Sequence, residues 1–354
     1  MDYSSTSVSK GVDDDDLVIP VINFQNFLQG DRNTRVEAAR AILDAFRNSG
    51  FIYLSNHGVS DEMVNDCFSH VAHFFARPQD QKDSLAWTDA RTNRGYVKAG
   101  REKLNLSGQA SDELRNQTPD LKETMEIGWD GNTSKPNKWP ERLDDEGVEF
   151  SRFMRVFYDR MHDLNLQIMS AIALGMGLDE AFFTPFVDAK DNNLRILHYP
   201  SVRETGRTDK IRIRAGAHSD YGSITLLLQD SIGGLEVQSP RGTWVRAKPI
   251  PGTIVVNAGD LLSRWSNDLI KSTKHRVVQP PPKPDGSSSS SSQEPETGSE
   301  TILPERYSVA YFCIPNFDAL IDALPGTWEL DPVGKKYPSI LSGEYQYQRL
   351  SETF

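Results

Sequence analysis

The stretch Ala217-His218-Ser219-Asp220-Tyr221-Gly222-Ser223 leads directly into a run of apolar residues at 224–228. A short apolar run that follows glycine and serine indicates a strand buried in the interior of the fold. His218 and Asp220 therefore lie beside a buried strand, where polar side chains need a partner of their own. A bound metal ion would be such a partner.

A second histidine fits the same site. His275 follows Asp220 after 55 residues and opens the β-branched run His275-Arg276-Val277-Val278. Two imidazoles and one carboxylate can occupy one face of a ferrous ion and leave three coordination positions open. We therefore predict that His218, Asp220 and His275 bind iron(II). A structural zinc site is conceivable from these ligands alone. It would, however, give no role to Arg306, a further polar residue on a predicted strand that is described next.

Arg306 and Ser308 stand two residues apart in Arg306-Tyr307-Ser308-Val309-Ala310-Tyr311-Phe312, so on a strand both side chains face the same side. A guanidinium grips a carboxylate with two parallel hydrogen bonds, and a hydroxyl adds a third. This pair predicts a site for the far carboxylate of a dicarboxylic co-substrate. With the metal site, it points to an iron centre that uses a 2-oxo acid and molecular oxygen.

The second half of the chain predicts a β-rich core. Apolar segments separated by Gly, Pro, Asp and Ser indicate strands at 194–199, 211–218, 224–229, 235–238, 244–247, 253–257, 275–279 and 307–312. Many short strands at such spacing are typical of a double-sheet jelly roll, or double-stranded β-helix. We predict a mixed α/β (α+β) fold with this core and with N-terminal and flanking helices.

The first half of the chain predicts helices and few strands. A strand at 17–24 precedes a helix that starts with the capping box Thr34-x-x-Glu37 and ends at Gly50. A strand at 51–54, a helix from about Asp61 and a long helix at about 148–174 follow, and 80–145 has the composition of a long surface loop. The helices are expected on the outer face of one sheet.

These patterns divide the chain into four parts. We expect a disordered N-terminus at 1–16, a helical and strand region at 17–190, the jelly-roll core at 191–318 and a C-terminal extension at 319–354. Within the core, 280–304 contains a six-serine run, prolines and acidic residues. Such a composition cannot bury a core, so this segment is expected to be a flexible insertion.

Composition limits the class of protein. The chain has 354 residues, a formal net charge of −11 and two cysteines, Cys67 and Cys313, in apolar contexts. The negative charge argues against nucleic acid or an anionic membrane as a partner. The widely separated cysteines indicate buried thiols in a reducing compartment, and we expect a cytoplasmic protein with no obligate protein partner.

The motifs His218-x-Asp220, His275 and Arg306-x-Ser308 resemble those of the iron(II)/2-oxoglutarate-dependent dioxygenases of the isopenicillin N synthase-like superfamily. The resemblance extends over nearly the whole chain. Within the superfamily the chain is similar to the thymine dioxygenases (thymine 7-hydroxylases), and the matching segments are Arg94-Gly95-Tyr96, Gly100-Arg101-Glu102-Lys103, Glu126-Ile127-Gly128, 195–200, 214–229, 255–281 and 306–313. One departure is Leu197-His198-Tyr199-Pro200, where plant-type members carry Asn-Tyr-Tyr-Pro.

The resemblance implies a reaction and further site residues. It implies Fe(2+) as cofactor, 2-oxoglutarate and O2 as co-substrates, ascorbate as a supporting reductant, and succinate and CO2 as co-products. Tyr199 would join Arg306 and Ser308 at the 5-carboxylate of 2-oxoglutarate, and Asn257 would orient a metal ligand. The implied substrate is a small molecule, either a free nucleobase or a secondary metabolite, and the 5-methyl group of thymine is the expected reaction site. The residues expected to contact it are Arg195, Tyr221, Phe312, Asn93 and Arg94.

Other interpretations remain open at this point. For Tyr221, Phe312 and Arg195, core packing or a salt bridge is the alternative. His198 is expected to point away from the site, because adjacent strand residues alternate. Two other functions compete with thymine oxidation: a tailoring oxygenase (hydroxylase or desaturase) of secondary metabolism, and a non-catalytic binder that keeps the fold. The remaining histidines, which lack acidic partners at ligand spacing, are expected to be structural or on the surface: His57, His70, His73 and His162.

Overall fold

A nine-stranded sheet forms the centre of the computed structural model, which describes residues 8–89, 91–100, 122–205, 213–279, 300–329 and 331–353. The strand order is β1-β2-β3-β12-β9-β15-β6-β5-β4, antiparallel throughout except for the parallel pair β2–β3. The strands are β1 (Val8–Asp14), β2 (Leu17–Asn23), β3 (Phe51–Ser55), β4 (Gly95–Val97), β5 (Glu123–Gly128), β6 (Asn193–Tyr199), β9 (Ile224–Gln229), β12 (Thr253–Ala258) and β15 (Arg306–Cys313).

A smaller sheet packs against the inner face of the large one. Its order is β11-β10-β13-β8, from Trp244–Arg246 (β11), Leu235–Gln238 (β10), His275–Val278 (β13) and Ile213–His218 (β8). Side chains from both sheets share two apolar clusters, one of which joins Ala215 and Val277 to Leu197, Tyr199 and Ala310. Two antiparallel sheets packed in this way form the predicted jelly roll, so the expected fold class is confirmed.

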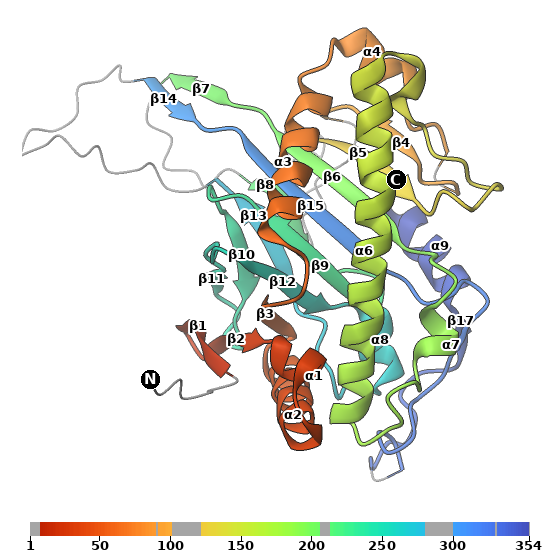
Figure 1. Ribbon diagram of the computed structural model, residues 1–354. Helices are drawn as coiled ribbons and strands as arrows, with labels where there is room; N and C mark the ends of the chain where they lie inside the picture. The colour runs from red at the N-terminus through yellow and green to blue at the C-terminus, as the bar shows by residue number, and fades with distance from the viewer. Residues whose placement is uncertain are drawn as a thin grey trace, which may run out of the picture.

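Helices cover the outer face of the large sheet (Figure 1), as expected. The largest apolar cluster lies there, between the sheet and α2, α3 and α6. α6 contacts β9 and β15, and α3 contacts β6 and β15. The helices are α1 (Gln25–Gln29), α2 (Arg32–Asn48), α3 (Asp61–Phe75), α4 (Gln79–Ser84), α6 (Asp145–Gly175), α7 (Thr184–Val187), α8 (Asp260–Trp265) and α9 (Ser342–Thr353), with a 3₁₀ turn at Pro140–Arg142.

The start of α2 differs from the predicted capping box. Asp31 is the N-cap, and its carboxylate accepts a hydrogen bond of 2.8 Å from the backbone N–H of Thr34. An aspartate at this position satisfies one of the N–H groups that the first turn leaves without an internal acceptor. The predicted end of the helix holds, because Gly50 has a φ of +73° and follows the C-cap Ser49.

The prediction of a disordered N-terminus is wrong for residues 8–16. Residues 8–14 form β1, which pairs with β2 through a turn at Asp15 and Asp16, and both of these residues have positive φ. Backbone hydrogen bonds to a neighbouring strand do not require apolar side chains, so an acidic edge strand carries little hydrophobic signal. Residues 1–7 lie outside the described residues.

The prediction of a long loop at 80–145 is also wrong in part. This region includes most of α4 and the strands β4 and β5, which extend the large sheet beyond β6. All six residues of β5 are buried, several of them polar, and this removes the alternation that a half-buried strand would show. Residues 101–121 lie outside the described residues.

The predicted flexible insertion at 280–304 is only partly described. Residues 280–299 lie outside the described residues, but 300–303 form β14 (Glu300–Leu303), which pairs with β7 (Val202–Thr205). The end of the segment is therefore ordered, against expectation. A further short ladder pairs β16 (Leu320–Ile321) with β17 (Ile340–Leu341).

The nine-stranded sheet takes strands from both sides of the predicted boundary at residue 190. Among the described helices, none is both long enough and apolar enough to cross a bilayer.

Candidate metal centre

The two sheets bring His218, Asp220 and His275 to one point. His218 is the last residue of β8 and His275 the first of β13, and the antiparallel register pairs them directly. Their rings lie 4.4 Å apart between centroids. The Nε2 atoms of His218 and His275 each lie 3.7 Å from Oδ1 of Asp220. In the described part of the chain, no other group of three such ligand-type side chains converges in this way.

Backbone carbonyls set the tautomer of both histidines. Nδ1 of His218 lies 2.7 Å from the carbonyl oxygen of Gly216, and Nδ1 of His275 lies 3.2 Å from that of Thr273. A carbonyl can only accept, so each Nδ1 carries the hydrogen and donates it. Each Nε2 is left with a lone pair that faces the common point.

Asp220 is oriented by two donors. Its Oδ2 accepts from the hydroxyl of Thr225 at 2.5 Å and from the amide Nδ2 of Asn257 at 2.7 Å. These contacts leave Oδ1 turned toward the two imidazoles. Burial acts to raise the pKa of Asp220, but His275, His218 and the two donors outweigh it, so the pKa is lowered and the carboxylate is ionised.

The protonation states suit a cation. Desolvation, reinforced by the neighbouring His275, lowers the pKa of His218 to about 4, so its imidazole is neutral at neutral pH. The structure therefore offers two imidazole nitrogens and one carboxylate oxygen on a single side. This donor set fits a ferrous ion with open positions for further ligands.

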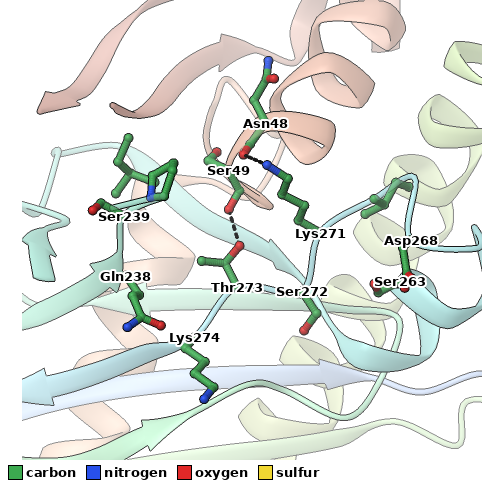
Figure 2. A pocket seen from close by; sticks show the side chains of 13 residues that line it. Asn48, Ser49, Gln238, Ser239, Ser263, Asp268, Lys271, Ser272, Thr273 and Lys274 are labelled. Carbon is green, nitrogen blue, oxygen red and sulfur yellow. Dashed lines mark hydrogen bonds between the residues drawn. The ribbon is translucent and has the colours of Figure 1, made fainter. Parts of the chain in front are cut away.

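The segment that leads into His275 is anchored to the end of α2 (Figure 2). The hydroxyl of Thr273 donates to the carbonyl oxygen of Ser49 at 2.7 Å, and Nζ of Lys271 donates to that of Asn48 at 3.0 Å. Because the carbonyl of Thr273 also accepts from His275, these contacts hold one metal-site histidine in place. Both contacts lie at a surface hollow lined by these residues and by Ser239, Ser272 and Lys274.

Arg306, Ser308 and Tyr199 also converge. Arg306 on β15 stands directly opposite Tyr199 on β6, and its Cζ lies 5.0 Å from the Tyr199 ring centroid. Nη1 of Arg306 donates to the Ser308 hydroxyl at 3.2 Å. Arg306 is 1% exposed, its Nε has no acceptor, and no carboxylate of the described chain pairs with it. A buried guanidinium without a counter-ion fits the distal carboxylate of 2-oxoglutarate.

Arg195 and Phe312 lie together on the inner face of the large sheet. The Cζ atom of Arg195 is 5.6 Å from the Phe312 ring centroid, and its Nε is 2.6 Å from Oε1 of Glu126. Phe312 stands opposite Thr225, whose hydroxyl binds Asp220. Phe312 therefore neighbours a residue that binds the metal-site aspartate, and Arg195 lies against Phe312 while also forming the salt bridge considered as its alternative.

Glu126 joins Arg195 to a chain of buried polar groups that the sequence did not reveal. Glu126 is 1% exposed and accepts from the amide of Asn193 at 2.6 Å. The oxygen of that amide accepts from Nη1 of Arg94 at 3.1 Å. Arg94 also donates to the backbone oxygen of Asn93. Arg94 thus reaches the site through Asn193.

The two remaining substrate candidates occupy loops. Asn93 has a φ of +48°, and its Oδ1 accepts from the indole N–H of Trp87 at 3.1 Å. Tyr221 follows the metal-site aspartate, and Cζ of Arg349 on α9 lies 4.6 Å from its ring centroid. The C-terminal helix therefore packs beside the metal-site loop, an arrangement that no sequence motif indicated.

His198 points away from the metal site, as predicted. Its Nδ1 lies 2.7 Å from Oε1 of Glu123, and its ring stacks on Tyr307, which has the opposite orientation to Arg306 and Ser308 on β15. His162 lies 3.1 Å from the amide nitrogen of Asn192, in the helix-side core. Neither belongs to the metal cluster.

Comparisons with known proteins agree with this geometry. Residues 19–142 match a family model described as the N-terminal region of non-haem dioxygenases in morphine synthesis, and residues 190–315 match the 2OG-Fe(II) oxygenase superfamily. A 2-oxoglutarate-Fe(II) type oxidoreductase of Metarhizium rileyi is 31% identical over 95% of this chain and 91% of its own length. A proline hydroxylase of Petromyces alliaceus is 31% identical over 94% of this chain and 98% of its own.

Solved structures provide a second comparison. The full-length thymine 7-hydroxylase of Neurospora crassa, in complex with α-ketoglutarate and thymine, is 44% identical, with a TM-score of 0.85. The alignment covers 98% of this chain and all of that chain. A 2OG-Fe(II) oxygenase family protein from Caulobacter crescentus is 28% identical, with a TM-score of 0.75 over 97% of this chain and 99% of its own.

Proposed function

The chain belongs to the iron(II)- and 2-oxoglutarate-dependent oxygenases, and we propose that it hydroxylates the 5-methyl group of thymine. It is a dioxygenase that uses Fe(2+), 2-oxoglutarate and O2. The proposed reaction converts thymine, 2-oxoglutarate and O2 into 5-hydroxymethyluracil, succinate and CO2. Further rounds at the same carbon would give the aldehyde and then the acid.

We assign the iron to Nε2 of His218, Oδ1 of Asp220 and Nε2 of His275. The bound iron and its co-substrate supply the oxidative chemistry, whereas the protein supplies placement and shields the site from water. The contacts of Asn257 and Thr225 with Asp220 fix which carboxylate oxygen is available. The hydrogen bond from Asn257 to Asp220 supports the proposed role of Asn257 in orienting a metal ligand.

We assign the co-substrate's 5-carboxylate to Arg306, Ser308 and Tyr199. This assignment is supported by the buried charge of Arg306, which forms no ion pair with a carboxylate of the described residues. Its side chain is 1% exposed and donates a hydrogen bond to the Ser308 hydroxyl. An apolar lining that includes Leu197 and Ala310 surrounds these groups. In such a lining a charged hydrogen bond is stronger than in water.

The observation that carries the thymine proposal is Arg195, held by Glu126 beside the Phe312 ring. A pyrimidine base has a flat face that packs on an aromatic ring and in-plane carbonyl oxygens that accept from a guanidinium. A fixed Arg195 can donate to such a carbonyl, with Phe312 and Tyr221 as candidates for the flat face. Asn93 is a further candidate for the base edge, and Arg94 would act through Asn193. The Neurospora crassa complex with thymine, from a protein 44% identical to this one, supports the proposal.

A tailoring oxygenase is the second candidate. Its support is the set of fungal relatives, among them the proline hydroxylase, which is 31% identical over 94% of this chain. This scaffold accepts different substrates through its loops, so both candidates use the same metal centre.

A turnover experiment distinguishes the two candidates. The protein is purified without oxygen and loaded with ferrous iron and 2-oxoglutarate, and the visible metal-to-ligand charge-transfer band is recorded. Succinate formation is then measured with thymine, 5-hydroxymethyluracil, uracil and L-proline. We expect the band, together with succinate formation that thymine and 5-hydroxymethyluracil stimulate and that uracil, which lacks the methyl group, does not.

Arg195→Met tests the substrate assignment. We expect the variant to keep the charge-transfer band and to lose most thymine-dependent turnover, since Arg195 is assigned to the substrate and not to the metal. Arg152→Met, at an exposed position on α6 that pairs with Glu149, is the control and should keep both. Stimulation by L-proline and not by thymine would favour the second candidate and reject the first.

A further inference from the structure

A second buried arginine faces the same tyrosine as Arg306. Arg214 lies on β8 of the small sheet, the strand that ends at His218, and its side chain is buried. Its Cζ lies 5.6 Å from the Tyr199 ring centroid, and that of Arg306 lies 5.0 Å from the same centroid. Two guanidinium groups from opposite sheets therefore contact one aromatic ring.

The charges of both arginines are buried, and Asp230 acts on Arg214 only from beyond ion-pair distance. Arg214 is 3% exposed and Arg306 is 1% exposed. In the part of the chain that the structure describes, neither side chain pairs with a carboxylate within ion-pair distance. Burial, together with the like charge of Arg306, lowers the pKa of Arg214. Two like charges held together in the interior need an anion nearby.

Polar atoms without partners collect around this pair of charges. Nη2 of Arg214 donates to the backbone oxygen of Pro304 at 2.9 Å, but Nη1 has no acceptor. Nε of Arg306 has none either. Gln229 stands directly opposite Ser308 in the large sheet, and both polar atoms of its amide are buried without a hydrogen bond.

A purely structural role accounts for only part of these facts. The bond to Pro304 would anchor the chain just before β15, but a neutral carbonyl does not balance a charge. A purely structural role for Arg214 also does not explain why its Nη1 atom and the Gln229 amide are buried without hydrogen-bond partners. A carboxylate between the sheets could accept hydrogen bonds from Nη1 of Arg214, Nε of Arg306 and Nε2 of Gln229 together.

We propose that Arg214 is a second cationic contact for the 5-carboxylate of 2-oxoglutarate, with the Gln229 amide as an additional donor. Arg306 and Ser308 then hold the carboxylate from the large sheet, and Arg214 holds it from the small sheet. This arrangement makes the site selective for a 2-oxo acid that carries a second carboxylate. The inference depends on the co-substrate and not on the identity of the oxidised substrate, so failure of the thymine proposal would leave it intact.

Calorimetry with two co-substrates tests the proposal. Without oxygen and with ferrous iron present, the Kd is measured for 2-oxoglutarate and for 2-oxopentanoate, which has the same chain length but no second carboxylate. In Arg214→Met we expect the Kd for 2-oxoglutarate to rise about 10- to 100-fold, the loss expected for a charged hydrogen bond. The Kd for 2-oxopentanoate should change less than about twofold, since that acid lacks the carboxylate that Arg214 would hold.

The control is Arg276→Met. Arg276 lies on the neighbouring strand β13, but it is paired with Glu236 at 2.7 Å and packs over Trp244, so both Kd values should stay at wild-type levels. Equal weakening of both acids in Arg214→Met would indicate a structural role and overturn the proposal, as would an unchanged Kd for 2-oxoglutarate.

A crystal structure of the wild-type protein with 2-oxoglutarate gives a test that does not depend on the folding of a variant. We expect a guanidinium nitrogen of Arg214 within hydrogen-bond distance of a 5-carboxylate oxygen, about 3.2 Å or less. A 5-carboxylate bound by Arg306 and Ser308 with Arg214 out of reach would contradict the proposal.

Discussion

At the scale of single residues, the candidate site depends on partners that fix each ligand. Both histidines donate Nδ1–H to backbone carbonyls, and Asp220 accepts from Asn257 and Thr225 through one oxygen. These contacts make the donor atoms point to a common centre before any ion arrives. Preorganisation of this kind raises metal affinity, because less ordering is needed on binding.

Asn257→Ala tests this preorganisation. Loss of one of the two donors to Oδ2 of Asp220 should weaken Fe(2+) binding about 10- to 100-fold without abolishing it. His218→Ala, which removes a proposed ligand, should abolish specific binding. The iron affinity of both variants is measured by anaerobic titration with ferrous iron. The control is His70→Ala on α3, in which we expect the affinity to be unchanged. Wild-type affinity in Asn257→Ala would mean that Thr225 alone orients the carboxylate.

At the scale of elements, the N-cap residue of α6 links that helix to the end of α3. Asp144 is the N-cap of α6 and accepts from the backbone N–H of Gly147 at 2.7 Å. The same carboxylate receives two hydrogen bonds, of 2.7 and 2.8 Å, from Arg77, which follows α3. The Arg77 guanidinium and the Gly147 N–H lower the pKa of Asp144 to about 2. One side chain thus caps the longest helix and ties it to α3.

Asp144→Ala should reduce the free energy of unfolding by about 1–2 kcal/mol, because the N-cap is lost. Asp144→Asn keeps a capping oxygen and loses only the charge. This should cost less than about 1 kcal/mol, since the carboxylate is 40% exposed and screened by solvent. Urea denaturation of the three proteins measures both effects.

The contribution of the Asp144 charge to the free energy of unfolding should decrease at acidic pH. The pKa of Asp144 is lower in the folded protein than its usual value of 3.8, so its charge stabilises the fold above about pH 4. That contribution is lost as the pH falls from 4 through 2. The stability difference between wild type and Asp144→Asn should therefore be constant near neutral pH and shrink over this acidic range. A difference that grows on acidification would contradict the assignment.

At the scale of the whole molecule, a buried charge cluster attaches the added edge of the large sheet. Glu123 on β5 lies 2.9 Å from Nζ of Lys82 on α4 and 2.7 Å from Nδ1 of His198 on β6, and it also accepts from the hydroxyl of Tyr96 on β4. Burial acts to raise the pKa of Glu123, but these three partners outweigh it and lower the pKa. Four elements from both sides of residue 190 thus depend on one carboxylate.

Lys82→Met should destabilise the protein by about 3–5 kcal/mol, because it leaves the buried charge of Glu123 without its cation. The double variant Lys82→Met with Glu123→Gln removes that charge and keeps one acceptor oxygen in place of the two that Tyr96 and His198 contact. We expect it to be more stable than Lys82→Met alone. A double-mutant cycle by chemical denaturation measures the coupling, and additive effects would show that the pair is not coupled.

Much of the fold and site could be predicted from short-range patterns. Apolar runs between glycine, serine and proline placed the strands that hold His218, His275 and Arg306, and the two-residue spacing of Arg306 and Ser308 placed both on one face. β1 and β5 were missed. An acidic edge strand and a fully buried strand both lack the alternation on which the prediction depends.

By itself the sequence determined most strands of the core, the candidate ligand set and the shared orientation of Arg306 and Ser308 on their strand. All of these follow from neighbours within a few residues, where backbone geometry fixes direction. Only the tertiary structure decided that Arg214 faces Arg306 across two sheets, that Glu126 holds Arg195, and that α9 packs beside Tyr221. These contacts join segments far apart in the chain, and their positions depend on how the sheets pack, which no local pattern encodes.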